Sequence, residues 1–204
     1  MSQFALIDYG AGNLRSVANA LRAAGAGDVA VTADPDVVAR AERIVLPGVG
    51  AFAACMAGLT AIDGMVDAMT ARVRGDGAPF LGICVGMQLM ADAGEEHGRH
   101  AGLGWIGGTV RAFVPAADLR VPHMGWNDVT PALAHPVIAG GEAYYLHGYH
   151  FADVAAADVL ATSAHGEKFV AAVGRENMMG VQFHPEKSQR YGIALLERFL
   201  AWRP

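Results

Sequence analysis

The chain has 204 residues, and its 20 Asp and Glu against 15 Lys and Arg give a formal net charge of −5. A hydrophobic content of 53% with 17% charged residues excludes a disordered chain, and the acidic balance without a long Lys/Arg run argues against a nucleic acid or an anionic membrane as partner. The sequence has no apolar run long enough for a membrane span, no visible export signal and too few cysteines for a disulfide framework, so we expect one cytoplasmic domain over residues 1–204.

Short apolar runs and helical stretches alternate through the first half of the chain. Buried strands are predicted at residues 4–8, 28–32, 43–46 and 79–83. Helical spacing of apolar residues predicts helices at about 13–24, at about 52–74 and from about Met87. Because strands separated by helices are joined by right-handed crossovers, this half predicts an α/β fold with a parallel sheet.

The second half has little helical periodicity between residues 102 and 182 and is rich in Gly, Pro, Tyr, Trp and Val. Segments typical of strands, which predict a partly antiparallel extension, lie at 109–113, 143–147, 159–163, 168–172 and 180–183. We expect Ser188 to cap a last amphipathic helix, which carries Ile193, Leu196 and Leu200 at helical spacing.

The segment Gly82-Ile-Cys-Val-Gly86 lies between a predicted strand and a predicted helix. It has the Gly-x-nucleophile-x-Gly pattern of a nucleophile elbow, with a thiol as the nucleophile. The sharp turn needs strained backbone angles and small neighbours, which explains the two glycines. A helix N-terminus favours the thiolate of Cys84, and the Val85 N–H can stabilise an oxyanion. The alternative is a buried structural cysteine beside two packing glycines.

A cysteine nucleophile requires a histidine and a third group that orients it, and residues 184–186 read His-Pro-Glu. In an extended chain, His184 and Glu186 point to the same face. Pro185 fixes its own φ and pushes His184 into an extended conformation. This tripeptide alone is a weak signal, but together with the cysteine elbow it favours catalysis.

The sequence predicts neither a cofactor nor a metal ion. Gly10-Ala-Gly-Asn13 has the start of a dinucleotide-binding fingerprint, but Arg15 replaces its third glycine, so we interpret it as a tight turn. His147 and His150 are three residues apart with no third ligand at a suitable spacing, which argues against zinc. Cys55 is expected in the core, and we expect solvated side chains at His97, His100, His135 and His165.

A second glycine-rich loop, Pro47-Gly-Val-Gly50, ends the third predicted strand. Glycines around Val49 allow a peptide N–H to turn toward a pocket, so that Gly48, Val49 and Gly50 can supply a second oxyanion donor. The alternative is a plain turn. Ligand sites in open α/β sheets form at the strand carboxyl ends, where this loop and the cysteine elbow would meet.

These motifs resemble those of a class I, triad-type glutamine amidotransferase. Three further segments narrow the resemblance to the glutaminase subunit of imidazole glycerol phosphate synthase, of histidine biosynthesis: residues 8–14, residues 47–52 and Pro122-His-Met-Gly-Trp-Asn127. The match covers effectively the whole chain. It implies an open, three-layer α/β fold with a mixed, mainly parallel sheet flanked by helices and an antiparallel extension.

The resemblance also implies the roles of the site residues. Cys84 would attack the side-chain amide of glutamine, and His184, oriented by Glu186, would transfer the protons. The oxyanion would be held by Val85 and the loop 48–50. Glutamine would be recognised by Gln88 and by the backbone of Gly148 and Tyr149. The family usually carries serine where this chain has Gly148, which puts a hydroxyl contribution there in doubt.

In this family the ammonia passes to a cyclase subunit, a (β/α)8 barrel, so the resemblance implies a heterodimer and a partner surface. The candidates for that surface are Asn13, Met124, Trp126 and Asn127. An aromatic side chain suits the centre of an interface, but Trp126 could equally pack in the core. The glycines around Val49 further suggest that one oxyanion donor depends on the partner's ligand.

Two other functions stay open at this point. The first is the glutaminase of a different synthase, such as the pyridoxal phosphate or anthranilate system, which residues 122–127 and Val49 argue against. The second is a non-catalytic domain in which Cys84 is a redox sensor or a packing residue. A missing His184 or Glu186 would have supported that second alternative, and both are present.

Overall fold

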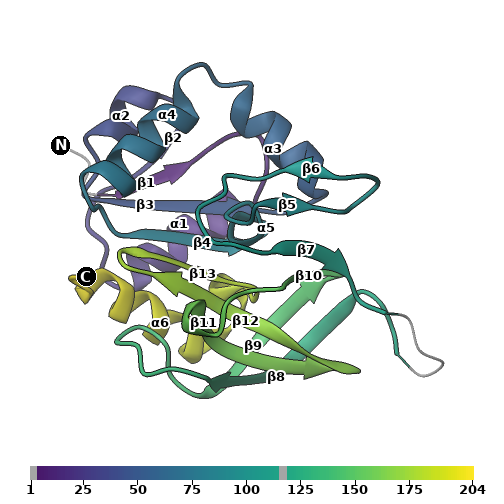
Figure 1. Cartoon of the computed structure of the whole chain (residues 1–204). Helices are drawn as coiled ribbons and strands as arrows, with labels where there is room; N and C mark the ends of the chain where they lie inside the picture. The colour runs from purple at the N-terminus through teal and green to yellow at the C-terminus, as the bar shows by residue number, and fades with distance from the viewer. Residues whose placement is uncertain (1–3, 115–118) are drawn as a thin grey trace.

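The computed structural model describes residues 4–114 and 119–204, and its framework is a nine-stranded sheet with helices on both faces (Figure 1). In order across the sheet, the strands are β2 (Val29–Thr32), β1 (Phe4–Ile7), β3 (Arg43–Gly48), β4 (Phe80–Cys84), β13 (Met178–Val181), β12 (Glu167–Arg175), β11 (Val159–His165), β8 (His123–Pro131) and β9 (Gly141–His147). Neighbours from β2 to β13 pair in parallel. The pairings from β13 to β9 are antiparallel, as expected for the extension.

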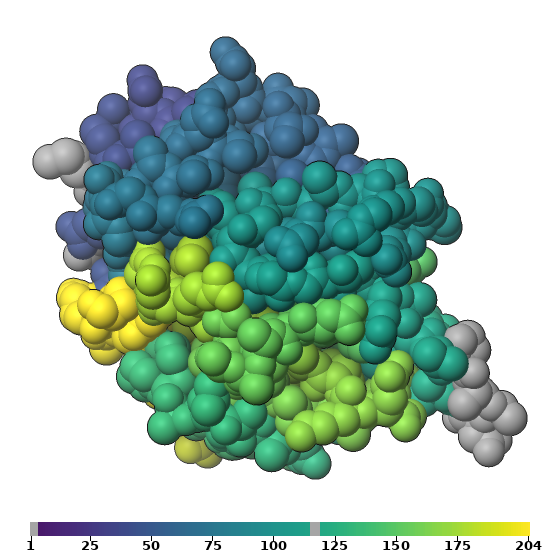
Figure 2. Space-filling model, in the orientation of Figure 1, coloured from purple at the N-terminus to yellow at the C-terminus, as the bar shows by residue number. Residues whose placement is uncertain are grey.

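A second, smaller sheet lies beside the first and has the order β10 (Tyr149–Ala152), β7 (Thr109–Ala112), β5 (Ala93–Gly94) and β6 (His100–Ala101). Strands β9 and β10 are separated by Gly148 alone, so this residue lies where the chain passes from one sheet to the other. Figure 2 shows the residues of the first half (purple to blue) on one part of this face and those of the second half (green) on the other.

The helices are α1 (Leu14–Ala23), α2 (Pro35–Ala39), α3 (Phe52–Thr60), α4 (Met65–Thr70), α5 (Val85–Gln88) and α6 (Gln189–Ala201), with a π-turn at Ala71–Gly75 and 3₁₀ turns at Ala156–Asp158 and Pro185–Lys187. Helix α1 packs against α6, and α4 packs against α2 and α3. All residues of β1, β3, β4 and β13 are buried, because helices cover both faces of the sheet there. This burial explains why these strands read as apolar runs without alternation.

The prediction of one long helix at about 52–74 is wrong. The chain forms α3 and then turns by 95° before α4 and the π-turn that follows it. Gly64, at φ +73°, precedes α4 in the left-handed conformation that allows this reversal. Apolar spacing continues on both sides of the turn, which is why periodicity alone missed it. Among the described residues no single helix is long and apolar enough to span a membrane; only this bent pair meets that test, by length and composition.

Three further local differences from the sequence predictions concern helices. The short helix α2 was not expected, although Asp34 accepts from the Asp36 N–H at 2.9 Å and Pro35 occupies the first turn. The helix after the elbow begins at Val85, not Met87, and has four residues. Ser188 precedes α6 but does not cap it, because its hydroxyl donates to the His184 carbonyl at 2.7 Å and accepts from the backbone N–H of Tyr144.

Candidate active site

Cys84 lies at the carboxyl end of β4 with φ +55° and ψ −112°, a strained conformation for a residue other than glycine. The flanking glycines are needed for close packing. A Cβ on Gly86 would overlap the carbonyl oxygen of Leu46, and one on Gly82 would come within 2.6 Å of the Gly86 carbonyl oxygen. The elbow is therefore formed by backbone segments that approach too closely for any side chain.

The helix that follows the elbow is short, which weakens the sequence argument that its dipole favours the Cys84 thiolate. Helix α5 comprises only Val85–Gln88, so its dipole at Cys84 is smaller than that of a full-length helix. The electrostatic environment of the thiol is therefore set mainly by the side chains around it.

His184 and Glu186 form a tight pair behind the thiol. Nδ1 of His184 lies 2.9 Å from Oε1 of Glu186, and both side chains are 2% exposed. The backbone of His184 is extended, but Glu186 belongs to the 3₁₀ turn Pro185–Lys187, so a turn, and not a straight strand, brings the two together. Because the carboxylate accepts from Nδ1–H, Nε2 is the nitrogen left for the thiol. Among the described residues this buried Nε2 has no hydrogen-bond partner.

The charge state of His184 depends on its two neighbours. Burial by itself lowers the pKa of this imidazole, but the Cys84 thiol and the Glu186 carboxylate outweigh that effect and raise the pKa to about 10. The site therefore favours a protonated His184 beside the sulfur. An imidazolium next to a sulfur stabilises the thiolate, the form that attacks a carbonyl carbon.

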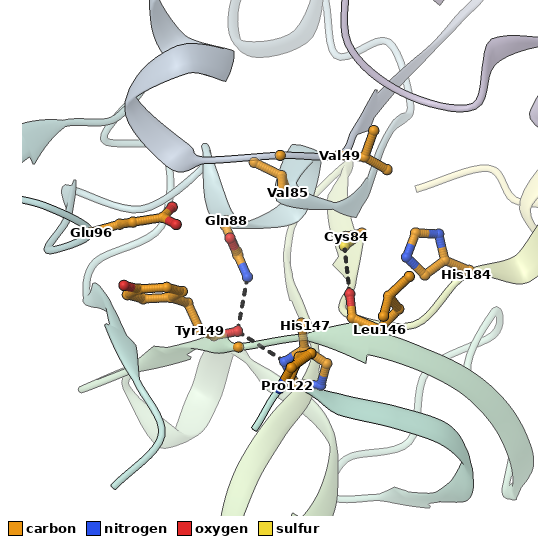
Figure 3. A pocket seen from close by; sticks show the side chains of 12 residues that line it. Val49, Cys84, Val85, Gln88, Glu96, Pro122, Leu146, His147, Tyr149 and His184 are labelled. Atoms are coloured by element: carbon orange, nitrogen blue, oxygen red, sulfur yellow. Dashed lines mark hydrogen bonds between the residues drawn. The ribbon is translucent and has the colours of Figure 1, made fainter. Parts of the chain in front are cut away.

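The Cys84 sulfur has two further polar neighbours when it is the neutral thiol. The Cys84 thiol donates to the Leu146 carbonyl at 3.9 Å, as Figure 3 shows, and accepts from Nε2 of Gln182 at 3.7 Å. Gln182 was not singled out by sequence reasoning, because nothing in the sequence places this residue next to position 84.

A cavity of about 280 Å³ opens over Cys84 and His184 (Figure 3). Eight of the residues expected in the site line it: Val49, Gly50, Cys84, Val85, Gln88, Gly148, Tyr149 and His184. Glu186 lies next to His184, and Gly48 is packed so tightly that a Cβ there would meet the Gly86 nitrogen at 2.7 Å. Strand pairing places Gly48 directly opposite Cys84.

The loop after β3 is held on one side by a second cysteine. The Cys55 thiol in α3 donates to the Val49 carbonyl at 3.5 Å, and Gly50 follows at φ +110°. Cys55 is buried, as the sequence predicted, and it also fixes the carbonyl between Val49 and Gly50 on the α3 side. The Val49 side chain is exposed.

Gln88 is oriented by hydrogen bonds to the chain itself. Its Nε2 donates to the Tyr149 carbonyl and to Oε1 of Gln182, both at 3.0 Å, so its own Oε1 is left to accept from a ligand. The Tyr149 carbonyl also lies 2.9 Å from Nδ1 of His147, and the Gly148 carbonyl accepts from the Phe113 N–H at 3.2 Å. Both carbonyls are therefore occupied, so ligand contacts of this segment fall to its N–H groups.

Glu96 is a pocket residue that the sequence reasoning missed. It lines the cavity opposite Tyr149 (Figure 3), and its Oε2 accepts from the Phe52 N–H at 2.7 Å at the start of α3. A carboxylate in this position can bind a ligand's ammonium group. Only Glu95-Glu96 before an exposed turn signals it in the sequence, and acidic pairs in loops are common.

Gly148 is not required by the backbone. A Cβ at this position would lie 3.6 Å from Cγ1 of Val121, an ordinary contact, and its φ is not left-handed. A serine would therefore fit, and its absence removes a hydroxyl from the pocket without a structural reason.

The residues expected at a partner surface lie outside the cavity. On β8, Met124 is 66% and Trp126 47% exposed, so core packing of Trp126 is excluded. Its ring makes an edge contact with Tyr144 at 6.1 Å. Asn13 is exposed and caps α1, accepting from the Ser16 N–H. The Asn127 amide turns inward, donating to the Ala164 carbonyl and lying 3.1 Å from Nε2 of His123.

Sequence reasoning also missed a cluster of histidine side chains contributed by β8, β9 and β11. Nδ1 of His123 lies 3.0 Å from Nε2 of His147, and His165, expected to be solvated, stacks on His123 at 4.2 Å. Burial lowers the pKa of His123 to about 4 and that of His147 to about 3, so both rings are neutral. Within residues 4–114 and 119–204 no group of three or more His, Cys, Asp or Glu side chains could hold a metal ion.

These observations place a cysteine, a histidine and a glutamate together at the edge of an α/β sheet, an arrangement typical of cysteine hydrolases. The family described as Glutamine amidotransferase class-I matches residues 5–202, so the chain belongs to the class I glutamine amidotransferases. Solved structures with the same fold include "Crystal structure of glutamine amidotransferase" (TM-score 0.74, 17% identity, 97% of each chain covered). Another is "Structure of PurLQS from Thermotoga maritima" (TM-score 0.72, 18% identity, 98% of this chain and 99% of that chain).

Comparison with curated relatives shows to which family within this class the chain belongs. "Imidazole glycerol phosphate synthase subunit HisH" of Zymomonas mobilis is 58% identical, with 100% of this chain and 97% of the relative covered. The protein of the same name from Rhodospirillum rubrum is 53% identical, with 98% and 99% covered. Within its class, the chain belongs to the HisH family, which confirms the resemblance seen in its motifs.

Proposed function

We propose that the whole chain, residues 1–204, acts as one glutaminase domain that releases ammonia from glutamine for imidazole glycerol phosphate synthesis in the cytoplasm. One observation carries this proposal. In a single cavity, the thiol of Cys84 on a strained elbow faces His184, whose other nitrogen is held by a buried carboxylate. The names of the relatives supply the synthase, imidazole glycerol phosphate synthase, and the geometry supplies the chemistry.

The reaction runs in two halves. The Cys84 thiolate attacks the side-chain amide carbon of glutamine, and the negative oxygen is stabilised by the Val85 N–H and an N–H of the loop 48–50. One such donor contributes about 3–4 kcal/mol. His184 gives its Nε2 proton to the leaving nitrogen, so that ammonia departs and a thioester to Cys84 remains. His184 then takes a proton from water, which attacks the thioester and releases glutamate.

Substrate recognition follows from the groups that surround the cavity. Oε1 of Gln88 and the carboxylate of Glu96 are acceptors for the α-ammonium group of glutamine. The N–H groups around Gly148 and Tyr149 are donors for its α-carboxylate. This arrangement would place the side-chain amide of the substrate toward Cys84, and it selects a free amino acid because both charged ends are read.

We further propose that the ammonia passes to a (β/α)8-barrel cyclase subunit. In water at neutral pH most ammonia is protonated and has no lone pair with which to attack, so a water-excluded path preserves its reactivity. The exposed Met124 and Trp126 on β8 are apolar side chains suited to the centre of such an interface. We take the loop 48–50 to be the element on which the liganded partner acts, so the isolated chain is expected to hydrolyse glutamine slowly.

The experiment mixes the purified chain with glutamine, a cyclase subunit and its nucleotide, and measures glutamate. We expect hydrolysis that depends on the liganded partner and falls by about 10⁴-fold or more in Cys84→Ser, because the hydroxyl is a far weaker nucleophile here. Gly27→Ala is the control and should retain most activity, because nothing lies within 4 Å of a Cβ at that exposed position. Full turnover in Cys84→Ser would refute the thioester route, and equal turnover with and without the partner would refute the coupling.

A further inference from the structure

Gln182 connects the nucleophile to the residue that recognises the substrate, yet it does not line the cavity. It lies directly after β13 and two residues before His184, and its side chain is completely buried. Its Nε2 donates to Sγ of Cys84 at 3.7 Å, and its Oε1 accepts from Nε2 of Gln88 at 3.0 Å. A buried amide is costly unless it is hydrogen-bonded, and this one has a partner at each end.

The network fixes which end of the Gln182 amide faces the sulfur. The two hydrogens on Nε2 of Gln88 point to two oxygens, the Tyr149 carbonyl and Oε1 of Gln182. Flipping the Gln182 amide would place two NH₂ groups against each other. The amide nitrogen of Gln182 is therefore directed at Cys84. Gln88 donates to Gln182, and Gln182 donates to the sulfur of Cys84.

The two polar neighbours of the sulfur favour opposite states of the thiol. The Leu146 carbonyl accepts a hydrogen bond from the S–H group, so this contact stabilises the neutral thiol. The Gln182 N–H is a donor, and a donor to sulfur stabilises the thiolate more than the thiol. When the proton moves from Cys84 to His184, the contact with Leu146 is lost and the contact with Gln182 becomes stronger.

We propose that Gln182 is a positioning residue of the glutaminase reaction: it stabilises the Cys84 thiolate and orients the Gln88 amide so that Oε1 of Gln88 faces the substrate. This inference rests on the proposed function of the same site. It assigns one buried side chain two separable effects, one on the nucleophile through its nitrogen and one on substrate binding through its oxygen.

Two substitutions of nearly equal size separate these effects. Gln182→Met removes both polar atoms, whereas Gln182→Glu keeps an acceptor for Gln88 and removes the N–H donor to sulfur. Alkylation of Cys84 by iodoacetamide is followed across pH by mass spectrometry of its peptide, so that Cys55 does not contribute. Glutamine kinetics are measured in the complex with the cyclase and its nucleotide.

In Gln182→Met we expect alkylation at pH 7 to slow about tenfold, with less than about a twofold change at a pH where the thiol is fully ionised. The kcat for glutamine should fall at least about tenfold, and KM should rise. In Gln182→Glu the alkylation rate at pH 7 should also fall, but KM should stay close to that of the unmodified chain.

Asn177→Leu is the matched control, because it removes another buried amide at the opposite end of β13, where Asn177 donates to two backbone carbonyls. It should lower thermal stability and leave the alkylation profile and KM unchanged. A folded Gln182→Met with unchanged alkylation at pH 7 and unchanged KM would overturn the proposal. If Gln182→Met does not fold, unchanged alkylation in Gln182→Glu overturns it. Alkylation needs no turnover, so this result is independent of whether Cys84→Ser abolishes glutaminase activity.

Discussion

At the scale of single residues, the site depends on positions where only one residue type fits. Cys84 is held at a positive φ by the close approach of two backbone segments, and Gly86 is the residue through which they touch. The strain at Cys84 presents its sulfur to the cavity, and the packing of the neighbouring strands maintains that strain. A side chain at Gly86 would push helix α5 away from Leu46 of β3 and relax the elbow.

We therefore expect Gly86→Ala to destabilise the chain by about 3 kcal/mol, because the new methyl group would overlap the Leu46 carbonyl oxygen. Glutaminase activity should be lost even at temperatures where the variant stays folded. Urea denaturation and a glutamate assay measure the two effects. Gly27→Ala is the control, since nothing lies within 4 Å of a Cβ there and the change should stay within about 0.5 kcal/mol. Equal stability of the two variants would contradict this account of the elbow.

At the scale of elements, the pairing of β8 with β9 links an exposed face to the pocket wall. His123 and His147 are directly opposite each other in this pairing. The carbonyl of Tyr149 can only accept, so His147 carries its proton on Nδ1 and accepts at Nε2 from Nδ1–H of His123. Nε2 of His123 then accepts from the Asn127 amide. In this series of three hydrogen bonds, from Asn127 to His123, His147 and the Tyr149 carbonyl, every donor points from β8 toward the cavity.

This direction predicts one tautomer for both rings, the Nδ1–H form, which ¹⁵N NMR of labelled histidine distinguishes. Asn127→Asp should reverse the first contact, because a carboxylate accepts a hydrogen bond from Nε2–H of His123 and so favours the imidazolium form of that ring. KM for glutamine should then rise through the disturbed Tyr149 carbonyl.

Asp128→Asn, a change at the neighbouring exposed position, serves as the control. It should leave the ¹⁵N signals of both histidine rings and the KM for glutamine unchanged. If His147 of the unmodified protein carries its proton on Nε2, the proposed series of hydrogen bonds is excluded.

At the scale of the whole molecule, the pKa values of the buried histidines are shifted in opposite directions, and these shifts determine how the free energy of unfolding depends on pH. His123 and His147 have lowered pKa values, so the stability they contribute is complete above about pH 6.5 and is lost as pH falls toward 4 and 3. His184 has a raised pKa, so its contribution is complete below about pH 6.5 and is lost as pH rises toward 10. Stability should therefore be greatest near neutral pH.

Between about pH 6 and 4.5, each buried neutral histidine should lower the free energy of unfolding by up to about 1.4 kcal/mol per pH unit. His147→Gln removes one such group and should make this acid slope shallower by about that amount. Urea denaturation at several pH values measures it. His97→Asn, at an exposed turn, should leave the slope as it is. An identical slope in His147→Gln and the unmodified chain would show that His147 titrates alike when folded and unfolded.

The sequence by itself determined the features that depend on consecutive residues. Apolar periodicity located most strands and α1 and α6, and the glycine spacing around Cys84 and the proline between His184 and Glu186 identified the elbow and the acid–base pair. These signals are local because backbone angles and helix or strand periods are set within a few residues. The motifs were also sufficient to place the chain in its family, which the relatives confirm.

Only the tertiary structure decided which distant side chains complete the site. Gln182 lies 98 positions from Cys84, and Glu96 and His147 line the cavity from a separate loop and strand. Cys55 and His123 do not line it but contact two residues that do, Val49 and His147. The structure also showed that the Trp126 side chain is exposed and that the predicted long helix ends at Thr60. Such contacts depend on how sheets and helices pack, and packing involves residues whose separation along the chain carries no periodic signal.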